Sequence, residues 1–143
     1  NKGYFLDLHT YRKYYLKYQT PTTPSIPHMF GLKKMLEKIE LEGLENRWQR
    51  HKDMAYHVRN WALDHGQSFF TKERALSYTL TCIENIQNWD INKINKILLD
   101  RGYRMDRGYG KFKGKAFRIP HMGNIYMNDL KEYLTVFNEA LKK

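Results

Sequence analysis

One pattern between residues 41 and 65 restricts the fold of this chain more than any other feature. Apolar residues and two histidines recur there every three to four positions, which predicts a long amphipathic helix. Gly43 favours a kink or a join near its start, and Gly66 is a typical cap at its end. Because histidines and alanines make a poor coiled-coil seam, we expect the helix to pack across a sheet. Its expected core residues are Leu41, Leu44, Trp48, His51, Ala55, Val58, Ala62 and His65, together with Met54 and Trp61.

Short alternating segments elsewhere predict the strands of that sheet. Residues 76 to 83 alternate between apolar and polar side chains and form the clearest strand pattern, with an apolar face that includes Cys82 and needs a covering layer of helices. Residues 67 to 70 favour a second short strand, and residues 116 to 119 a third. Residues 4 to 8 also fit a short strand, followed by an aromatic-rich helix or turn up to residue 18.

Three more helices are expected from the spacing of apolar residues. One follows Pro27, one is capped by Asp90 and stopped by Gly102, and the last starts at Asn128 or Asp129. The predicted fold class is therefore α+β: a small antiparallel or mixed sheet of three to four strands, covered on one face by helices and preceded by a long helix. The last helix is expected to point Leu130, Tyr133, Leu134, Phe137 and Leu141 inward.

Residues 108 to 123 form a glycine-punctuated basic loop that runs into an apolar strand with one arginine, Arg118. Alternation along a strand places Phe117 and Ile119 on one face and Arg118 on the other. If the first face is the core, the guanidinium points away from it, as a planar fork of donors suited to a carboxylate or phosphate. The alternative is an ordinary solvated arginine on an edge strand.

The net charge of +10 is concentrated around that loop. Residues 101 to 118 carry seven basic residues and one acidic residue, whereas residues 25 to 100 carry eleven and ten. A basic nucleic-acid or polyanion-binding module is therefore one hypothesis, which Tyr103, Tyr109 and Phe112 keep open as stacking residues. The role of the basic loop at residues 101 to 115 is not otherwise defined.

Other functional classes find little support in the sequence. No apolar run approaches 18 residues, so we expect no membrane span. The single Cys82 is expected to be a buried thiol in a reducing compartment, which predicts a cytoplasmic location. His51 and His57 lie six residues apart, on opposite helix faces, so no local metal pair is expected. The sequence also lacks a nucleotide-binding glycine loop and a Gly-x-Ser-x-Gly motif.

Three motifs in order resemble one known family. They are Thr-Pro-Thr-Thr-Pro at residues 20 to 24, Glu-Gly-Leu-Glu at 42 to 45 followed by Arg50 and His51, and the glycine-rich stretch at 108 to 123. With these motifs the chain resembles the C-terminal part of class V (fold-type I) pyridoxal-phosphate-dependent aminotransferases. This group contains the serine and alanine:glyoxylate aminotransferases, with phosphoserine aminotransferase further off.

The resemblance implies specific roles for three residues. Arg118 stands where such enzymes bind the α-carboxylate of the amino-acid substrate. Gln19 and Thr22 stand where a polar residue and a threonine reach the phosphate of pyridoxal 5′-phosphate in the neighbouring subunit, so a homodimer is implied. The expected reaction moves an amino group between a serine- or alanine-like amino acid and a 2-oxo acid such as glyoxylate or pyruvate. Pro120 departs from the family pattern, in which a small residue follows the strand.

The same resemblance implies that most of the catalytic centre lies outside this chain. The lysine that forms the Schiff base, the aspartate under the pyridine ring and the stacked aromatic belong to a large domain whose motifs are absent from these 143 residues. Residues 1 to 27 would then be the end of that domain plus a Thr/Pro connector, and residues 28 to 143 the small domain with its long helix. We expect this segment to be inactive alone. A phosphoserine aminotransferase-like enzyme and a dimerisation domain without chemistry stay open as alternatives.

Overall fold

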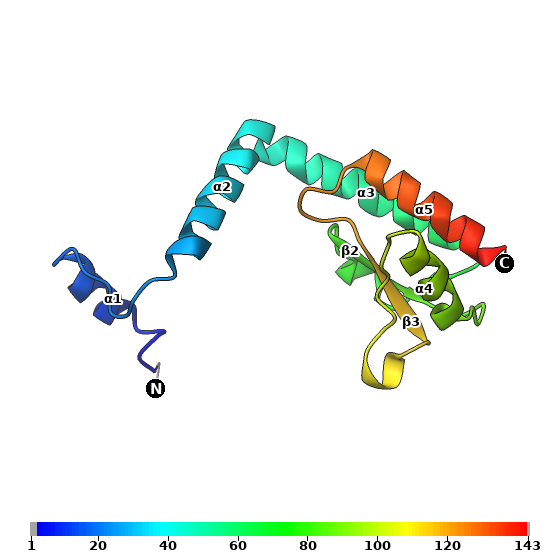
Figure 1. The fold of residues 1–143 in the computed structure, drawn as a ribbon, viewed down its shortest axis with the longest axis horizontal. Helices are drawn as coiled ribbons and strands as arrows, with labels where there is room; N and C mark the ends of the chain where they lie inside the picture. Colours follow the sequence, from blue (N-terminus) through cyan, green and yellow to red (C-terminus); the bar gives the residue numbers. More distant parts are fainter. Residues whose placement is uncertain (1–2, 143) are drawn as a thin grey trace. The chain divides into compact units, whose positions relative to one another are not determined.

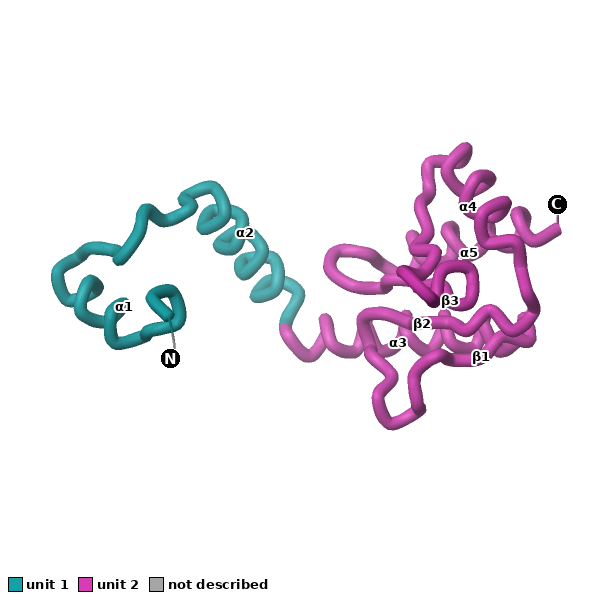
Figure 2. The backbone as a smooth tube through the Cα atoms, turned by 90° about the horizontal axis from the view of Figure 1, so that it is seen from below, with its two compact units in different colours: residues 1–43 teal, residues 44–143 magenta. Residues whose placement is uncertain are grey.

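The computed structural model describes residues 3 to 142 and divides the chain into two compact units, Asn1–Gly43 and Leu44–Lys143 (Figure 2). The first unit contains two helices, and the second contains a sheet and three helices. The elements are α1 (Leu8–Tyr15), α2 (Ile26–Glu42), α3 (Leu44–Asp64), β1 (Ser68–Phe69), η1 (Glu73–Ala75), β2 (Leu80–Glu84), α4 (Ile91–Asp100), η2 (Gly110–Phe112), β3 (Ala116–Pro120) and α5 (Met127–Leu141).

The strand predicted at residues 4 to 8 is wrong, because residues 3 to 6 form a turn and a helix begins at Leu8. Asp7 caps α1: its carboxylate accepts hydrogen bonds from the backbone N–H of His9 at 3.1 Å and the hydroxyl of Thr10 at 2.8 Å. The bond from His9 satisfies a backbone donor of the first helical turn that would otherwise have no partner, so the local capping chemistry favours a helix over an extended segment.

The second helix of the first unit agrees with the sequence pattern. Pro27 lies in its first turn, and α2 ends at Gly43, whose φ of +82° lies in the left-handed region. That conformation suits glycine because it has no side chain to clash, so the predicted join before α3 is confirmed. None of the described residues of this unit is buried within the chain. Leu32 and Leu36 are examples of its exposed apolar side chains.

The second unit has the predicted architecture of a small sheet with helices on one face. Its three strands are antiparallel in the order β1-β2-β3, and α3, α4 and α5 pack over one face of them (Figure 1). The core is formed between that face and the helices, which confirms the α+β fold class. It contains Met54, Val58, Trp61, Ala62, Ile83, Ile91, Ile94, Leu98, Met105, Phe117, Ile119, Leu130, Leu134, Phe137 and Ala140.

The clearest predicted strand exists but is shorter than expected and faces the other way. It spans Leu80–Glu84, and its buried residues are Thr81 and Ile83. The prediction that Cys82 is buried is wrong: Cys82 is only half-buried, on the face without helices. The strand register explains this difference, because Ile83 pairs with the core residue Phe117 and Cys82 pairs with the outward-facing Arg118.

The long helix α3 contributes only part of its predicted stripe to the core. Its buried residues run from Arg47 to Ala62, and they include Met54 and Trp61 as predicted. Trp48, in contrast, is 60% exposed, and Leu44 and Leu41 are exposed as well, so the prediction that they are core residues is wrong. Helical spacing shows which residues share a face, but it does not show how far along the helix the rest of the domain extends.

The remaining helix boundaries follow from capping. Asp90 caps α4 as predicted, because its carboxylate accepts from the backbone N–H groups of Asn92 and Lys93. The last helix begins at Met127, slightly earlier than predicted. Tyr126 is its N-cap, and the Tyr126 backbone N–H donates to the carboxylate of Asp129 at 2.8 Å, one half of a capping box.

Candidate functional site on the open face of the sheet

Arg118 lies where the alternation of its strand predicts. Its neighbours Phe117 and Ile119 are buried, while Arg118 is partly exposed on the face of the sheet that carries no helix. Because β3 is at the edge of the sheet, Arg118 has a strand partner, Cys82, on one side, and on the other side it forms an isolated antiparallel bridge with Asp106. On the other side the loop that precedes β3 folds back against it.

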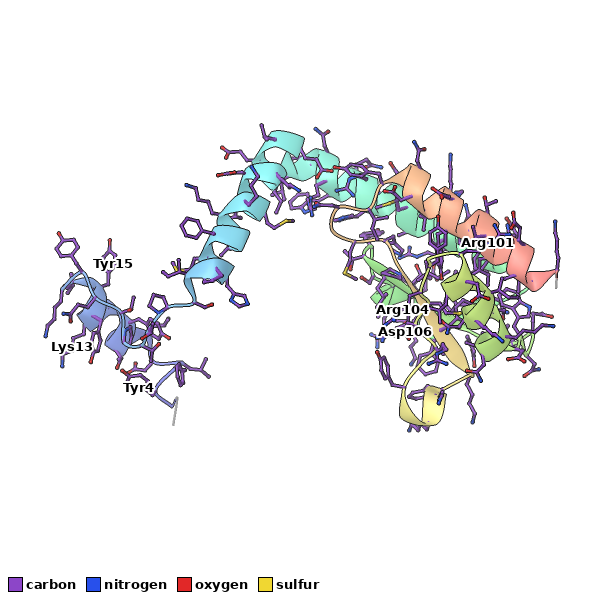
Figure 3. All side chains as sticks on the ribbon, in the orientation of Figure 1. Tyr4, Lys13, Tyr15, Arg101, Arg104 and Asp106 are labelled. Carbon is purple, nitrogen blue, oxygen red and sulfur yellow. The ribbon has the colours of Figure 1, made fainter. Side chains whose placement is uncertain are left out.

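A carboxylate on that loop pairs with the arginine. Nη2 of Arg118 donates to Oδ2 of Asp106 at 2.5 Å, and the backbone N–H of Arg118 donates to the Asp106 carbonyl at 3.3 Å. The hydrogen bond from Arg118 is the main cause that lowers the pKa of Asp106, and the same bond raises the pKa of Arg118. Both groups are therefore charged at neutral pH, as a charge-assisted pair. Figure 3 labels Asp106 on the segment between α4 and β3.

The turn that follows Asp106 depends on a glycine. The backbone N–H of Gly108 donates to Oδ1 of Asp106 at 2.9 Å, and Gly108 has a φ of +75°. A Cβ at this position would lie 2.6 Å from the carbonyl oxygens of both Phe112 and Ala116. Only glycine fits this backbone approach, so Gly108 fixes the loop that delivers Asp106 to Arg118.

Aromatic rings line a small pocket beside the guanidinium. Cζ of Arg118 lies 5.0 Å from the ring centroid of Tyr109, within the range of a cation–π contact, and the rings of Phe70 and Phe112 meet edge to face at 4.8 Å. Burial raises the pKa of the Cys82 thiol, so it is not a thiolate nucleophile at neutral pH. The pocket has a volume of about 170 Å³ and is lined by Phe70, Cys82, Gly108, Tyr109, Phe112, Ala116 and Arg118.

A buried histidine holds the turn after the strand. Nε2 of His121 is 2.9 Å from the Thr81 hydroxyl, and Nδ1 is 3.0 Å from the carbonyl of Tyr78. The ring is 0% exposed, and burial is the main cause that lowers its pKa to about 4. At neutral pH the imidazole is thus uncharged, with Nδ1–H as donor and Nε2 as acceptor. This arrangement fixes the backbone three residues after Arg118.

Two arginines of α3 fix the segment that follows. Arg47 and Arg50 each donate through Nη2 to the Gly123 carbonyl at 3.1 Å, and Arg50 also donates to the carbonyl of Ile125. Cζ of Arg50 lies 4.6 Å from the ring centroid of Tyr126. The motif residue Arg50 thus serves as a backbone clamp for the connection from β3 to α5.

The two other predicted site residues lie in the first unit. Gln19 and Thr22 are exposed and belong to the non-helical segment between α1 and α2. An amide N–H and a hydroxyl can both donate hydrogen bonds to the oxygens of a phosphate group, so the chemistry of this segment fits the predicted contact with a phosphate. Their roles stay predictions.

Sequence reasoning missed Asp106 as the partner of Arg118. Two signals could have identified it. Asp106 is the one acidic residue among the seven basic residues of positions 101 to 118. It also lies two residues before Gly108, and an Asp-x-Gly sequence is typical of a turn in which the carboxylate accepts a backbone N–H.

Within residues 3 to 142 the structure shows neither a grouping of three His, Cys, Asp or Glu side chains suited to a metal ion nor a helix with the length and apolarity to cross a bilayer.

Comparison with known proteins gives this geometry a context. No protein-family model matches the chain. An uncharacterised aminotransferase of Methanocaldococcus jannaschii is 36% identical over 99% of the chain and 37% of its own length. The serine–glyoxylate aminotransferase of Arabidopsis thaliana is 36% identical over 85% of the chain and 31% of its own length. A solved phosphoserine aminotransferase of Cytophaga hutchinsonii has a TM-score of 0.85 at 19% identity, over 97% of the chain and 38% of that protein.

The chain thus spans between 31% and 38% of the length of these proteins. At 19% identity the structural likeness shows the fold alone, whereas the two relatives at 36% identity share sequence with most of the chain. Arg118 and the three motifs of the resemblance lie on the fold that these proteins share. The relatives that the chain matches are class V aminotransferases, and the chain corresponds to a part of their length.

Proposed function

We propose that this chain is the C-terminal segment of a pyridoxal-phosphate-dependent aminotransferase. The complete enzyme transfers an amino group between a serine- or alanine-like amino acid and a 2-oxo acid such as glyoxylate or pyruvate. The observation that carries this proposal is the Arg118 guanidinium, held on the open face of the sheet beside a pocket of about 170 Å³. The names of the relatives, which include alanine– and serine–glyoxylate aminotransferases, support it.

Arg118 binds the α-carboxylate of the substrate in this proposal. The Asp106 pair uses Nη2, and the planar fork has further donors that can take a carboxylate. Asp106 is anchored by its own backbone and by Gly108, so it fixes the plane of the guanidinium before substrate arrives. Holding the carboxylate at a fixed point orients the α-carbon for proton transfer and lowers the entropic part of the barrier.

The cofactor and the second subunit are part of the same proposal. Pyridoxal phosphate, when bound, supplies the electron sink that stabilises the carbanion formed at the α-carbon. The exposed amide of Gln19 and hydroxyl of Thr22 would hold its phosphate in the neighbouring subunit of a homodimer. The reacting lysine and the groups around the pyridine ring belong to the large domain. The cytoplasmic location stays a prediction.

Replacement of Arg118 by alanine in the complete enzyme tests the assignment. We expect a higher KM for both substrates and a lower kcat/KM. The loss of transition-state stabilisation should be about 2 to 4 kcal/mol, the range for removing one partner of a charge pair. This corresponds to a loss of roughly 30-fold to 1,000-fold, measured by steady-state kinetics. Arg101→Ala is the matched control, because Arg101 forms a solvent-exposed pair with Glu139 at 3.7 Å. Unchanged kinetics in Arg118→Ala would refute the assignment.

The isolated 143-residue chain provides a second test, since it is predicted to lack the reacting lysine. We expect no covalent adduct with pyridoxal phosphate, measured by absorbance and by mass spectrometry after borohydride reduction. A stoichiometric adduct on a single lysine would show that the proposed division between large and small domain is wrong.

The alternatives have less support. The phosphoserine aminotransferase-like alternative rests on a structural neighbour at 19% identity, which carries the fold alone. The nucleic-acid alternative has lost part of its basis, because Arg118, one of the clustered bases, is neutralised by Asp106.

A further inference from the structure

A second arginine of this domain is buried without a carboxylate partner. Arg59 of α3 is 8% exposed, and its Nη2 donates to the Ser77 carbonyl at 2.9 Å. Its Nε is buried and has no acceptor, and no carboxylate among residues 3 to 142 forms an ion pair with it. A buried charge in this situation is costly unless an anion completes its hydrogen bonds.

Two tyrosines lie beside the guanidinium but leave its need for acceptors unmet. Cζ of Arg59 is 5.5 Å from the ring centroids of both Tyr56 and Tyr78, and the two rings are 6.3 Å apart. Cation–π contacts of this kind stabilise the positive charge through the ring faces. They accept no in-plane hydrogen bond, so a ligand with oxygen acceptors would add what these rings do not supply.

Arg59 forms part of the wall of an open pocket between α3 and the connection from β1 to β2. The pocket has a volume of about 610 Å³, within the range of roughly 300 to 1,000 Å³ typical of small-molecule sites. None of its residues lines the pocket beside Arg118. Its wall is formed by Tyr56, Arg59, Asn60, Leu63, Ser68, Phe69, Thr71, Glu73, Leu76 and Tyr78.

The wall combines three kinds of group. Arg59 supplies a positive charge, Glu73 supplies a negative charge, and Leu63, Phe69 and Leu76 supply apolar surface. The two charges do not pair with each other, so each is available to a ligand. A molecule with a carboxylate, an ammonium group and an aliphatic side chain complements all three.

We propose that this pocket binds a free amino acid with an aliphatic side chain. Its carboxylate pairs with the buried guanidinium of Arg59, its ammonium group with Glu73, and its side chain packs on the apolar wall. This site is separate from the carboxylate site at Arg118, and it does not depend on the proposed transamination.

Calorimetric titration of the complete protein with L-leucine tests the proposal. Two analogues separate the charges: 4-methylpentanoate lacks the amino group, and 3-methylbutylamine lacks the carboxylate. We expect L-leucine to bind most tightly, 4-methylpentanoate several-fold more weakly, and 3-methylbutylamine at least tenfold more weakly than L-leucine. Equal binding of all three compounds would overturn the proposal.

Variants assign the binding to this pocket. Arg59→Met keeps the volume of the side chain and removes its charge, so we expect at least a tenfold loss of affinity for L-leucine. Glu73→Gln is expected to weaken the binding of L-leucine several-fold and to leave the affinity for 4-methylpentanoate within twofold of the wild-type value. Arg101→Met, which changes an exposed arginine outside the pocket, is expected to bind as the wild type does.

Arg118→Ala distinguishes this site from the proposed active site. We expect it to leave L-leucine affinity within twofold, whatever its effect on turnover. If Arg118→Ala abolishes binding and Arg59→Met does not, L-leucine occupies only the active site and the inference fails. If Arg59→Met does not fold, a crystal structure of the wild-type protein grown with L-leucine gives the answer: density at Arg59 supports the site, and an empty pocket at saturating ligand overturns it.

Discussion

Arg118 and Arg59 belong to the same small domain but lie in contrasting electrostatic environments. The Arg118 side chain is 35% exposed and has a carboxylate at 2.5 Å, whereas Arg59 is 8% exposed and has only a backbone carbonyl and two tyrosine rings. Asp106 and greater exposure to water reduce the cost of the first charge, whereas the second has no carboxylate partner and little exposure to water. The more deeply buried charge is therefore the one with less compensation, which is why we place a ligand there.

Each of the two arginines also shifts the pKa of a neighbouring titratable group. Burial is the main cause that lowers the pKa of His121 to about 4, the hydrogen bond to the Tyr78 carbonyl opposes it, and the positive charge of Arg59 lowers it further. Beside Arg118, the effect is on an acid: the pKa of Asp106 falls below its ordinary value of 3.8. The two environments should therefore lose stability in different ranges of pH.

The largest expected effect on stability concerns His121, whose pKa the charge of Arg59 helps to lower. The folded state holds His121 neutral down to about pH 4, whereas the unfolded chain protonates it near its ordinary value of 6.5. The stability that neutral His121 contributes to the folded state is fully present above pH 6.5 and is lost as the pH falls from 6.5 to 4. The loss in free energy of unfolding should reach about 3 kcal/mol. Urea denaturation of this chain at several pH values, followed by the fluorescence of Trp61 and Trp89, measures it.

Matched variants show whether Arg59 contributes to this loss. Arg59→Met should raise the pKa of His121 and make the loss between pH 6.5 and 4 smaller, while Arg118→Met should leave it unchanged. His121→Gln should remove it, and the exposed His28 serves as the control position for the same change. An equal loss in wild type and His121→Gln would mean that other groups cause the acid sensitivity.

Local rules explain which parts of the fold the sequence predicts. The capping by Asp90 and the helix ends at Gly43 and Gly66 depend on residues next to one another in the chain, and the structure confirms them. The outward direction of Arg118 follows from alternation over a strand of five residues, and it is confirmed as well. Each of these predictions needed information from one segment only.

Apart from the strand expected at residues 4 to 8, where the local cap at Asp7 was missed, the errors concern contacts between segments that are far apart in the sequence. Residues 80 and 82 look more apolar than Thr81, yet the strand register turns Thr81 inward, where the ring of His121, 40 residues later, satisfies its hydroxyl. Arg59 lies beside the stripe of α3, and only the packing of Tyr78 and Ser77 against it reveals its environment. The exposure of Trp48 likewise depends on where the rest of the domain ends along α3.

The smallest expected effect on stability concerns the pair between Asp106 and Arg118. Asp106→Asn keeps the shape of the side chain and removes its charge, and because the pair is partly solvated it should cost about 1 kcal/mol or less at pH 7. Since the pKa of Asp106 is lowered in the fold, this contribution is present above its ordinary value of 3.8 and is lost as the pH falls through the folded pKa below it. Urea denaturation should thus show wild type and Asp106→Asn converging in acid, in a range where the loss from His121 is already complete. Glu139→Gln breaks the more exposed pair with Arg101 and should cost less. A difference between wild type and Asp106→Asn that persists unchanged at the lowest pH would show that the amide disturbs the loop at Gly108, and that the charge pair is not what stabilises it.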